Sequence, residues 1–117
     1  MSAQDDYSAV TRDVRVTVRP FFLADQSSAE EGRWVWAYRV RIENIGREPV
    51  QLLKRTWLIT DALARTQRVH GDGVVGEQPA LEPGESFEYT SGTPLPTPSG
   101  IMRGAYHMVS VASGELF

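Results

Sequence analysis

Apolar and polar residues alternate along two segments in the first half of the chain. The first segment places Val14, Val16 and Val18 between polar neighbours. The second has an apolar or aromatic residue at every second position, namely Trp34, Trp36, Tyr38, Val40 and Ile42. Since successive side chains of a strand point to opposite faces, this period of two predicts half-buried β-strands. We expect the five side chains of the second segment to face a hydrophobic core.

Further strands are predicted between segments rich in glycine, proline and polar residues. A polar loop is expected at 25–32, and turns are expected at 44–49, at 82–85 and along the run 92–100, which contains three prolines. The strands between and after these turns are predicted at 67–75, 86–91 and 101–111. About seven short strands at roughly 8–12-residue spacing, with no long helix, predict an all-β fold, an antiparallel β-sandwich.

The stretch from Val50 to Ala64 allows two interpretations. Pro49 is a permitted first residue of a helix, and Val50, Leu53 and Trp57 fall at helical spacing. β-branched and aromatic residues are frequent in the same stretch, however, and the neighbouring segments have the pattern of strands. The sequence therefore favours a strand here over a helix.

The composition agrees with one folded domain. The chain has 117 residues, of which 41% are hydrophobic and 23% are charged, so it can bury a self-supporting core. Residues 1–13 are polar and acidic without the pattern of a secretory signal, and we expect a flexible N-terminal segment before a domain at 14–117. The absence of cysteine and of a long apolar run leads us to expect a cytoplasmic protein that does not enter a membrane. The net charge of −3 argues against broad binding to nucleic acid.

Residues 71–76 spell G-x-G-x-x-G, the pattern that approaches a pyrophosphate in dinucleotide-binding folds. Pro79 follows too soon for the helix which that fold requires, so we reject a dinucleotide-binding fold. Two interpretations stay open. The glycines permit a tight turn or bulge beside a strand, or the backbone N–H groups form a nest for an anion. In the second case the binding residues are Gly71, Asp72, Gly73 and Gly76, and the ligand contains phosphate.

The sequence offers no catalytic residue, metal ligand or cofactor site. His70 and His107 are the only histidines, and a base at His70 oriented by Asp72 would still lack a nucleophile on a G-x-S-x-G elbow. Neither a D-x-D-x-D loop nor an H-x-x-x-H pair is present to bind a metal. The three tryptophans are interpreted as core residues instead of a stacking platform.

The run 92–100 is the other candidate functional segment. Pro94, Pro96 and Pro98 stiffen it, which suits a recognition loop held by a rigid scaffold. The alternative is a stiff crossover between two sheets with no binding role. We predict a partner-binding loop at these three prolines, while keeping the alternative open.

Several motifs in the second half of the chain resemble those of the ApaG family. The matching blocks are G-x-G-V-V-G-x-Q-P at 71–79, P-G-E at 83–85, Y-T-S-G at 89–92 and T-P-x-G-x-M-x-G-x-Y at 97–106. The resemblance implies a fibronectin type III-like sandwich, in the wider immunoglobulin-like class, without known enzymatic activity. It also implies partner recognition and, in bacteria, an association with cobalt resistance and magnesium efflux.

This chain departs from the family pattern in two places. Family members continue with another apolar strand past the point where this chain stops, at Phe117. The strand that would be covered then has an unpaired edge, so we expect edge-to-edge self-association or a borrowed partner strand. In addition, Phe87 stands where such sandwiches often have a corner tyrosine, so the hydrogen bond of that hydroxyl is lost.

Together these observations predict a non-catalytic binding module whose partner is another protein. The alternative is a small-ligand sensor that binds phosphate, pyrophosphate or a dinucleotide polyphosphate at the glycine-rich turn. Hydrolysis of such a nucleotide has the least support from the residues present.

Overall fold

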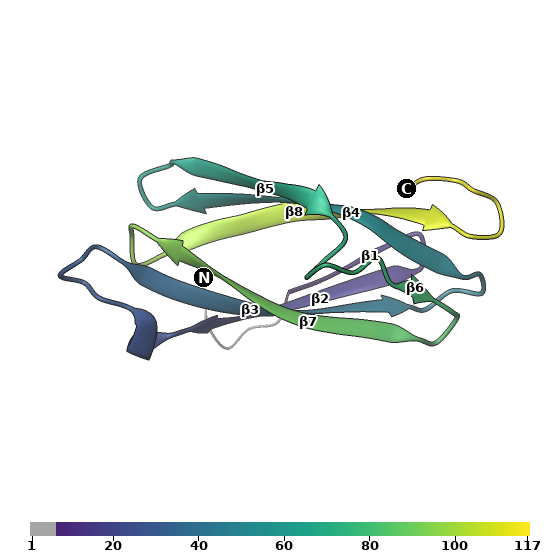
Figure 1. Ribbon diagram of the computed structural model, residues 1–117, viewed down its shortest axis with the longest axis horizontal. Coiled ribbons are helices and arrows are strands. Elements are labelled where there is room, and N and C mark those ends of the chain that lie inside the picture. Colours follow the sequence, from purple (N-terminus) through teal and green to yellow (C-terminus); the bar gives the residue numbers. More distant parts are fainter. Residues whose placement is uncertain (1–6) are drawn as a thin grey trace.

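A computed structural model describes residues 7–117 of the chain. Within it, eight strands and one short 3₁₀ turn follow each other along the sequence (Figure 1). They are β1 (Tyr7–Thr11), β2 (Val14–Phe22), η1 (Ala24–Gln26), β3 (Trp34–Asn44), β4 (Val50–Asp61), β5 (Thr66–Asp72), β6 (Ala80–Leu81), β7 (Ser86–Leu95) and β8 (Gly100–Ser110). The 1–13 segment was expected to be flexible. Residues 1–6 lie outside the described residues, while 7–11 form β1, which pairs with β2.

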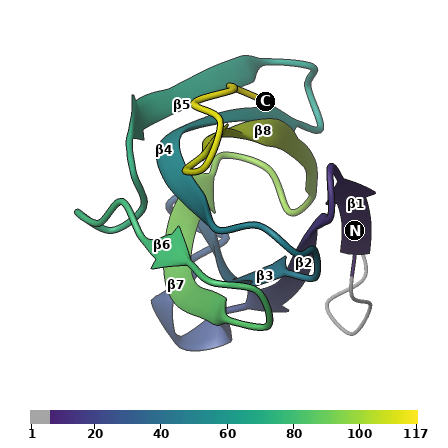
Figure 2. The same ribbon diagram turned by 90° about the vertical axis from the view of Figure 1, so that its right-hand side faces the viewer.

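The strands form two sheets packed face to face as a β-sandwich (Figures 1 and 2). The first sheet has the order β1-β2-β3-β7. In the second sheet β4 is central, with β5 and the short β6 along one side and β8 along the other. Every pairing is antiparallel. The predicted all-β sandwich is therefore confirmed.

The core lies between the sheets and uses the alternation seen in the sequence. Of the five β3 side chains expected to face it, Trp36, Tyr38, Val40 and Ile42 are buried and Trp34 is half-buried at the strand's start. Buried residues of β4, β6, β7 and β8 meet them from both sheets, namely Val50, Leu52, Ile59, Leu81, Tyr89, Leu95 and Met108. Because a fully buried apolar side chain contributes about 1.5–3 kcal/mol, this layer is the main source of stability.

The ambiguous stretch is a strand, as predicted, and it forms the middle of the second sheet. β4 pairs with β8 along almost its whole length, with a register shift between Leu52 and Lys54. The shift is a bulge at Leu53, whose carbonyl accepts hydrogen bonds from the N–H of Gly73 and from the Gln78 amide. The bulge thus lies where the glycine-rich turn meets the sheet.

Two predicted strand boundaries were wrong. The strand expected at 86–91 continues to Leu95, because β3 offers partners along its full length as far as Trp34. Pro94 is tolerated there because β7 pairs only with β3 and is an edge strand. The strand expected at 67–75 ends at Asp72 instead, since the next residues turn away from β4.

Asn44 was interpreted as part of a turn, but it is the buried last residue of β3. Its amide donates to the carbonyls of Glu48 and Leu81 at 2.8 and 2.9 Å, and its side-chain oxygen accepts the N–H of Gly46 at 3.0 Å. Its backbone also bonds to the 82–85 turn. One side chain therefore joins β3 to the turn before β4 and to β6.

A pair of tyrosines joins the two sheets. The hydroxyls of Tyr89 on β7 and Tyr106 on β8 hydrogen bond to each other. Burial raises the pKa of both phenols, so both stay neutral in the physiological range. Phe87, at the position of the expected corner tyrosine, packs against the core and stacks at a tilt near Tyr89.

Candidate functional site

The glycine-rich segment is a tight turn that leaves β5 and packs on the core. Gly73 and Gly76 have φ of +61° and +82°, and Val75 between them also has a positive φ of 44°. Val74 is fully buried, and its N–H and carbonyl exchange hydrogen bonds of 2.8 Å with the backbone of Glu77. Positive φ at the two central residues of such a turn favours glycine.

The turn uses most of the N–H groups that an anion nest would need. The N–H of Gly73 donates to Leu53, and those of Val74 and Glu77 donate to each other's carbonyls. In the part of the chain that the structure describes, the N–H groups of Val75 and Gly76 have no such partner. This bonding favours the structural interpretation of the glycines. The anion site at Gly71, Asp72, Gly73 and Gly76 stays a prediction.

Arg55 lies beneath this turn, and no local signal in the sequence indicates it. Its Nη1 donates to the carbonyl of Gly73 at 2.6 Å and reaches that of Asp72 at 3.5 Å. Gly71 pairs with Arg55 in the β4–β5 ladder. A Cβ added at Gly71 would lie 3.5 Å from Arg55 Nη1, at ordinary van der Waals distance. The cation thus holds the end of β5 and the turn in place.

The two histidines come together on the outer face of the second sheet. His70 Nδ1 and His107 Nε2 lie 2.7 and 3.2 Å from the Thr56 hydroxyl, and the ring centres are 6.4 Å apart. Asp72 lies on the same face two residues further along β5. The histidines are thus exposed strand residues that share Thr56 as a partner, and the catalytic base at His70 oriented by Asp72, which the sequence analysis set aside, gains no support from this geometry.

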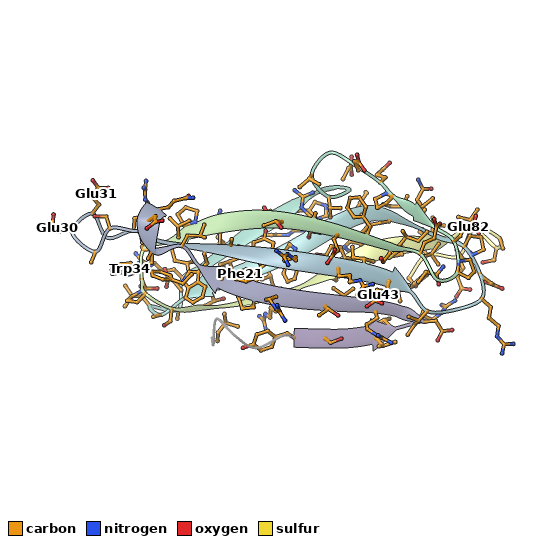
Figure 3. The ribbon with its side chains drawn as sticks, turned by 90° about the horizontal axis from the view of Figure 1, so that it is seen from below. Phe21, Glu30, Glu31, Trp34, Glu43 and Glu82 are labelled. Atoms are coloured by element: carbon orange, nitrogen blue, oxygen red, sulfur yellow. The ribbon has the colours of Figure 1, made fainter. Side chains whose placement is uncertain are left out.

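The three prolines of the candidate loop lie on one exposed side. Pro94, Pro96 and Pro98 are exposed, while Leu95 and Thr97 between them are buried. The segment reaches from the end of β7 to the start of β8, at the same end of the sandwich as the 24–33 connection (Figure 1). Figure 3 shows Glu30 and Glu31 projecting at this end, beyond Trp34. We name the residues 92–100 the proline segment.

Thr97 fixes the proline segment to the neighbouring β4–β5 turn. Its hydroxyl accepts the N–H of Ala62 at 3.0 Å and donates to the carbonyl of Ser99 at 2.8 Å. Asp61 holds the β4–β5 turn. Its carboxylate accepts hydrogen bonds from the N–H groups of Leu63 and Arg65 and pairs with the Arg65 guanidinium at 2.9 Å. The loop end is thus rigid through side-chain hydrogen bonds.

Asp61 makes this loop end sensitive to acid. Burial alone would raise the pKa of its carboxyl, but the N–H groups of Arg65 and Leu63 and the Arg65 guanidinium lower it below its ordinary value. The stabilisation is then complete above about pH 4 and is lost as the pH falls through the lowered pKa of the folded state. We expect Asp61→Asn to lower the Tm at pH 7 and to have a much smaller effect near pH 2. A Tm difference that stays constant across this range in thermal melts would contradict the assignment.

An apolar cleft opens between the sheets on the side of β1 and β8. Its volume is about 700 Å³, and its walls come from β1, β2, β3 and β7 of one sheet and from β4 and β8 of the other. Trp36 and Tyr106 are among the lining residues, and the Trp36 indole N–H has no acceptor within 7–117. A partner that enters this cleft would meet an apolar surface.

The outer edge of β8 is partly uncovered beside this cleft. The chain's last residues fold back on it, since Met108 and Phe117 exchange backbone hydrogen bonds and the Ser110 N–H donates to Glu115. Because bonding direction alternates along a strand, the backbone groups of Met102, Gly104 and Tyr106 point to the same outer edge. No strand of the described chain pairs with that part of the edge.

Two further properties concern metals and membranes. Within residues 7–117, no group of three or more His, Cys, Asp or Glu side chains is placed to hold a metal ion. No helix in that range is long and apolar enough to cross a membrane.

The eight strands, the glycine-rich turn and the proline segment define a two-sheet sandwich domain. Residues 24–110 match the model of the ApaG domain family. The chain belongs to the ApaG family.

Close relatives support this assignment. The ApaG protein of Rhodospirillum centenum is 68% identical over 111 residues, which cover 95% of this chain and 85% of that protein. The ApaG protein of Paramagnetospirillum magneticum is 66% identical over 87% of this chain and 78% of its own length. A crystal structure of a Bordetella pertussis protein has 47% identity and a TM-score of 0.87, covering 99% of this chain and 89% of that one.

Proposed function

We propose that the chain is a cytoplasmic, non-catalytic module that binds another protein through the loop end of the sandwich. The observation that carries this proposal is the proline segment, in which Pro94, Pro96 and Pro98 are exposed together while Leu95 and Thr97 hold the backbone. A segment that is already rigid loses little conformational entropy on binding, which favours affinity. Any role in cobalt resistance or magnesium efflux, which the family resemblance implies, would then pass through the partner.

Affinity capture with matched variants tests this proposal. Pro96→Asp/Pro98→Asp changes the exposed face of the proline segment, whereas Pro83→Asp changes an exposed proline in the turn at the opposite end. We expect wild type and Pro83→Asp to capture the same protein from a lysate and the double variant to lose it. Equal capture by all three folded proteins would exclude the proline segment as the binding surface.

A second candidate is supported by the uncovered edge of β8. Unpaired backbone groups at Met102, Gly104 and Tyr106 adjoin the apolar cleft, so an added strand gains both hydrogen bonds and burial. We therefore propose that this edge accepts a strand from another copy of the chain.

Light scattering and amide exchange test this self-association together. The mass should rise with protein concentration, and exchange at Gly104 and Tyr106 should slow as it does. The N–H groups of Arg103 and Ala105 point to β4, so their exchange should be slow at every concentration. A monomeric mass at all concentrations, with unchanged exchange at Gly104, would refute the proposal.

The small-ligand alternative has less support from the geometry. A phosphate-containing ligand at the glycine-rich turn could accept hydrogen bonds from the N–H groups of Val75 and Gly76. The Arg55 guanidinium, however, already donates to the carbonyls of Asp72 and Gly73. The cation beneath the turn is therefore already engaged by the chain itself.

A further inference from the structure

The outer face of the second sheet carries an excess of cations. The strand register places side chains of β5, β4 and β8 side by side in rows across this face. In one row, Arg68 and Arg103 lie on either side of Leu58. The two following rows contain His70 and His107. We name this surface the basic face, and it consists of Lys54, Thr56, Leu58, Thr60, Thr66, Arg68, His70, Asp72, Ile101, Arg103, Ala105 and His107. Asp72 is its only acidic residue.

The cations of the basic face have no carboxylate partner in the described chain. Lys54, Arg68 and Arg103 are exposed, and none of them forms an ion pair within residues 7–117. Lys54 is opposite Asp72 in the ladder, yet the two side chains are not in ion-pair contact. These cations are therefore available to an external anion.

The outer face of the first sheet is different, although it also carries several arginines. Arg15 and Arg41 both lie 3.8 Å from the Glu43 carboxylate, and the Arg39 guanidinium lies 5.6 Å from the centre of the Phe21 ring. Figure 3 shows Phe21 and Glu43 on this face. These three arginines interact with side chains of the chain itself. Substitutions on the first sheet can therefore serve as controls for substitutions on the basic face.

The His–Thr–His cluster lies among these cations. His70 Nδ1 and His107 Nε2 lie 2.7 and 3.2 Å from the Thr56 hydroxyl, so one nitrogen of each ring is used within the chain. Both histidines are exposed, and the second nitrogen of each ring can contact a ligand on this face.

The charged groups around the cluster are Lys54 and Asp72 in one row and Arg68 and Arg103 in the row on its other side. With the histidines counted as neutral, these groups give the face a net charge of +2. The face should therefore attract carboxylates.

We propose that the basic face docks an extended acidic segment of a partner protein. Side chains at alternate positions of an extended segment repeat at about 6.6 Å, the same interval that separates Arg68 from His70 along β5. The face has no Phe, Tyr or Trp on which bases could stack, and the net charge of −3 opposes long-range attraction of a nucleic acid. A short acidic segment interacts with the local charge only, because salt screens charges beyond about 8 Å.

This inference extends the proposed protein-binding function but uses a separate surface, so it can be tested separately. The probe is a synthetic ten-residue peptide with Glu at alternate positions, compared with the same peptide carrying Gln. Fluorescence anisotropy at physiological ionic strength should show binding of the Glu peptide only. Pro96→Asp/Pro98→Asp should leave this binding unchanged, even if those substitutions abolish capture of the natural partner.

Amino-acid substitutions test whether the Glu peptide binds to the basic face. Arg68→Gln/Arg103→Gln should weaken peptide binding about two- to thirtyfold, the range expected for losing two exposed ion pairs. Arg39→Gln/Arg41→Gln on the first sheet should leave it unchanged.

Two results would overturn the proposal. They are equal effects of the two arginine pairs, and binding of a ten-nucleotide single-stranded DNA as tight as that of the Glu peptide.

Discussion

Replacing Gly73 by alanine is expected to lower the free energy of unfolding by about 2–4 kcal/mol. About 1 kcal/mol comes from forcing a residue with a Cβ to a φ of +61°. The rest, about 1–3 kcal/mol, comes from crowding, because that Cβ would lie 2.1 Å from the carbonyl oxygen of Glu77. Backbone cannot move aside as a flexible side chain can, so the turn must shift. The Tm should fall by roughly 10 °C or more in thermal melts.

Gly76→Ala is the matched control for this prediction. Gly76 also has a positive φ, of +82°, but a Cβ there would meet no atom within 4 Å. It should cost only the backbone term of about 1 kcal/mol. Equal Tm changes in the two variants would show that crowding at Gly73 is absent. If Gly73→Ala left the Tm unchanged and lost affinity for inorganic phosphate instead, the anion-site interpretation of the turn would be right.

Replacing Asn44 by alanine should also cost about 2–4 kcal/mol. The side chain is 2% exposed, and its removal leaves the carbonyls of Glu48 and Leu81 and the N–H of Gly46 without partners. Each buried polar group left unpaired costs about 1–3 kcal/mol, less where water can enter. Chemical denaturation should show a lower midpoint with an unchanged slope.

Asn44→Asp should be at least as damaging at pH 7 as the alanine variant. A carboxylate there would face the carbonyl oxygens of Glu48 and Leu81 instead of donating to them. Acid should recover part of the loss relative to wild type, since a protonated carboxyl can donate to one of the carbonyls. Gln51→Ala is the control, because its amide makes a single exposed hydrogen bond and should change stability by less than about 0.5 kcal/mol. A loss in Gln51→Ala as large as in Asn44→Ala would contradict the account.

The strands were predictable because their signal is local. Alternation in β3 follows directly from the two faces of one strand, so Trp36 to Ile42 could be assigned to the core without knowing their partners. The ends of strands were less predictable. Pro94 and Asn44 have the composition of turns, yet both are in strands because a neighbouring strand or a buried carbonyl gives them a partner.

The candidate surfaces depend on pairing between distant segments, and the sequence does not show that pairing. Thr56, His70 and His107 meet only because β4 lies between β5 and β8 in a particular register. Arg55 was missed for the same reason, since its contacts with the glycine-rich turn are 17 and 18 residues away in the sequence. The proline segment was found from composition alone, but its rigidity depends on a hydrogen bond from Ala62 to Thr97.

Titration calorimetry with the captured partner tests the central claim most directly. The account predicts a saturable binding isotherm that Pro96→Asp/Pro98→Asp weakens by at least tenfold and that Pro83→Asp leaves unchanged, with no heat flow after saturation. A continuing heat flow from turnover of the partner, or of added nucleotide, would contradict a non-catalytic role, and equal affinities for the two variants would contradict binding at the loop end.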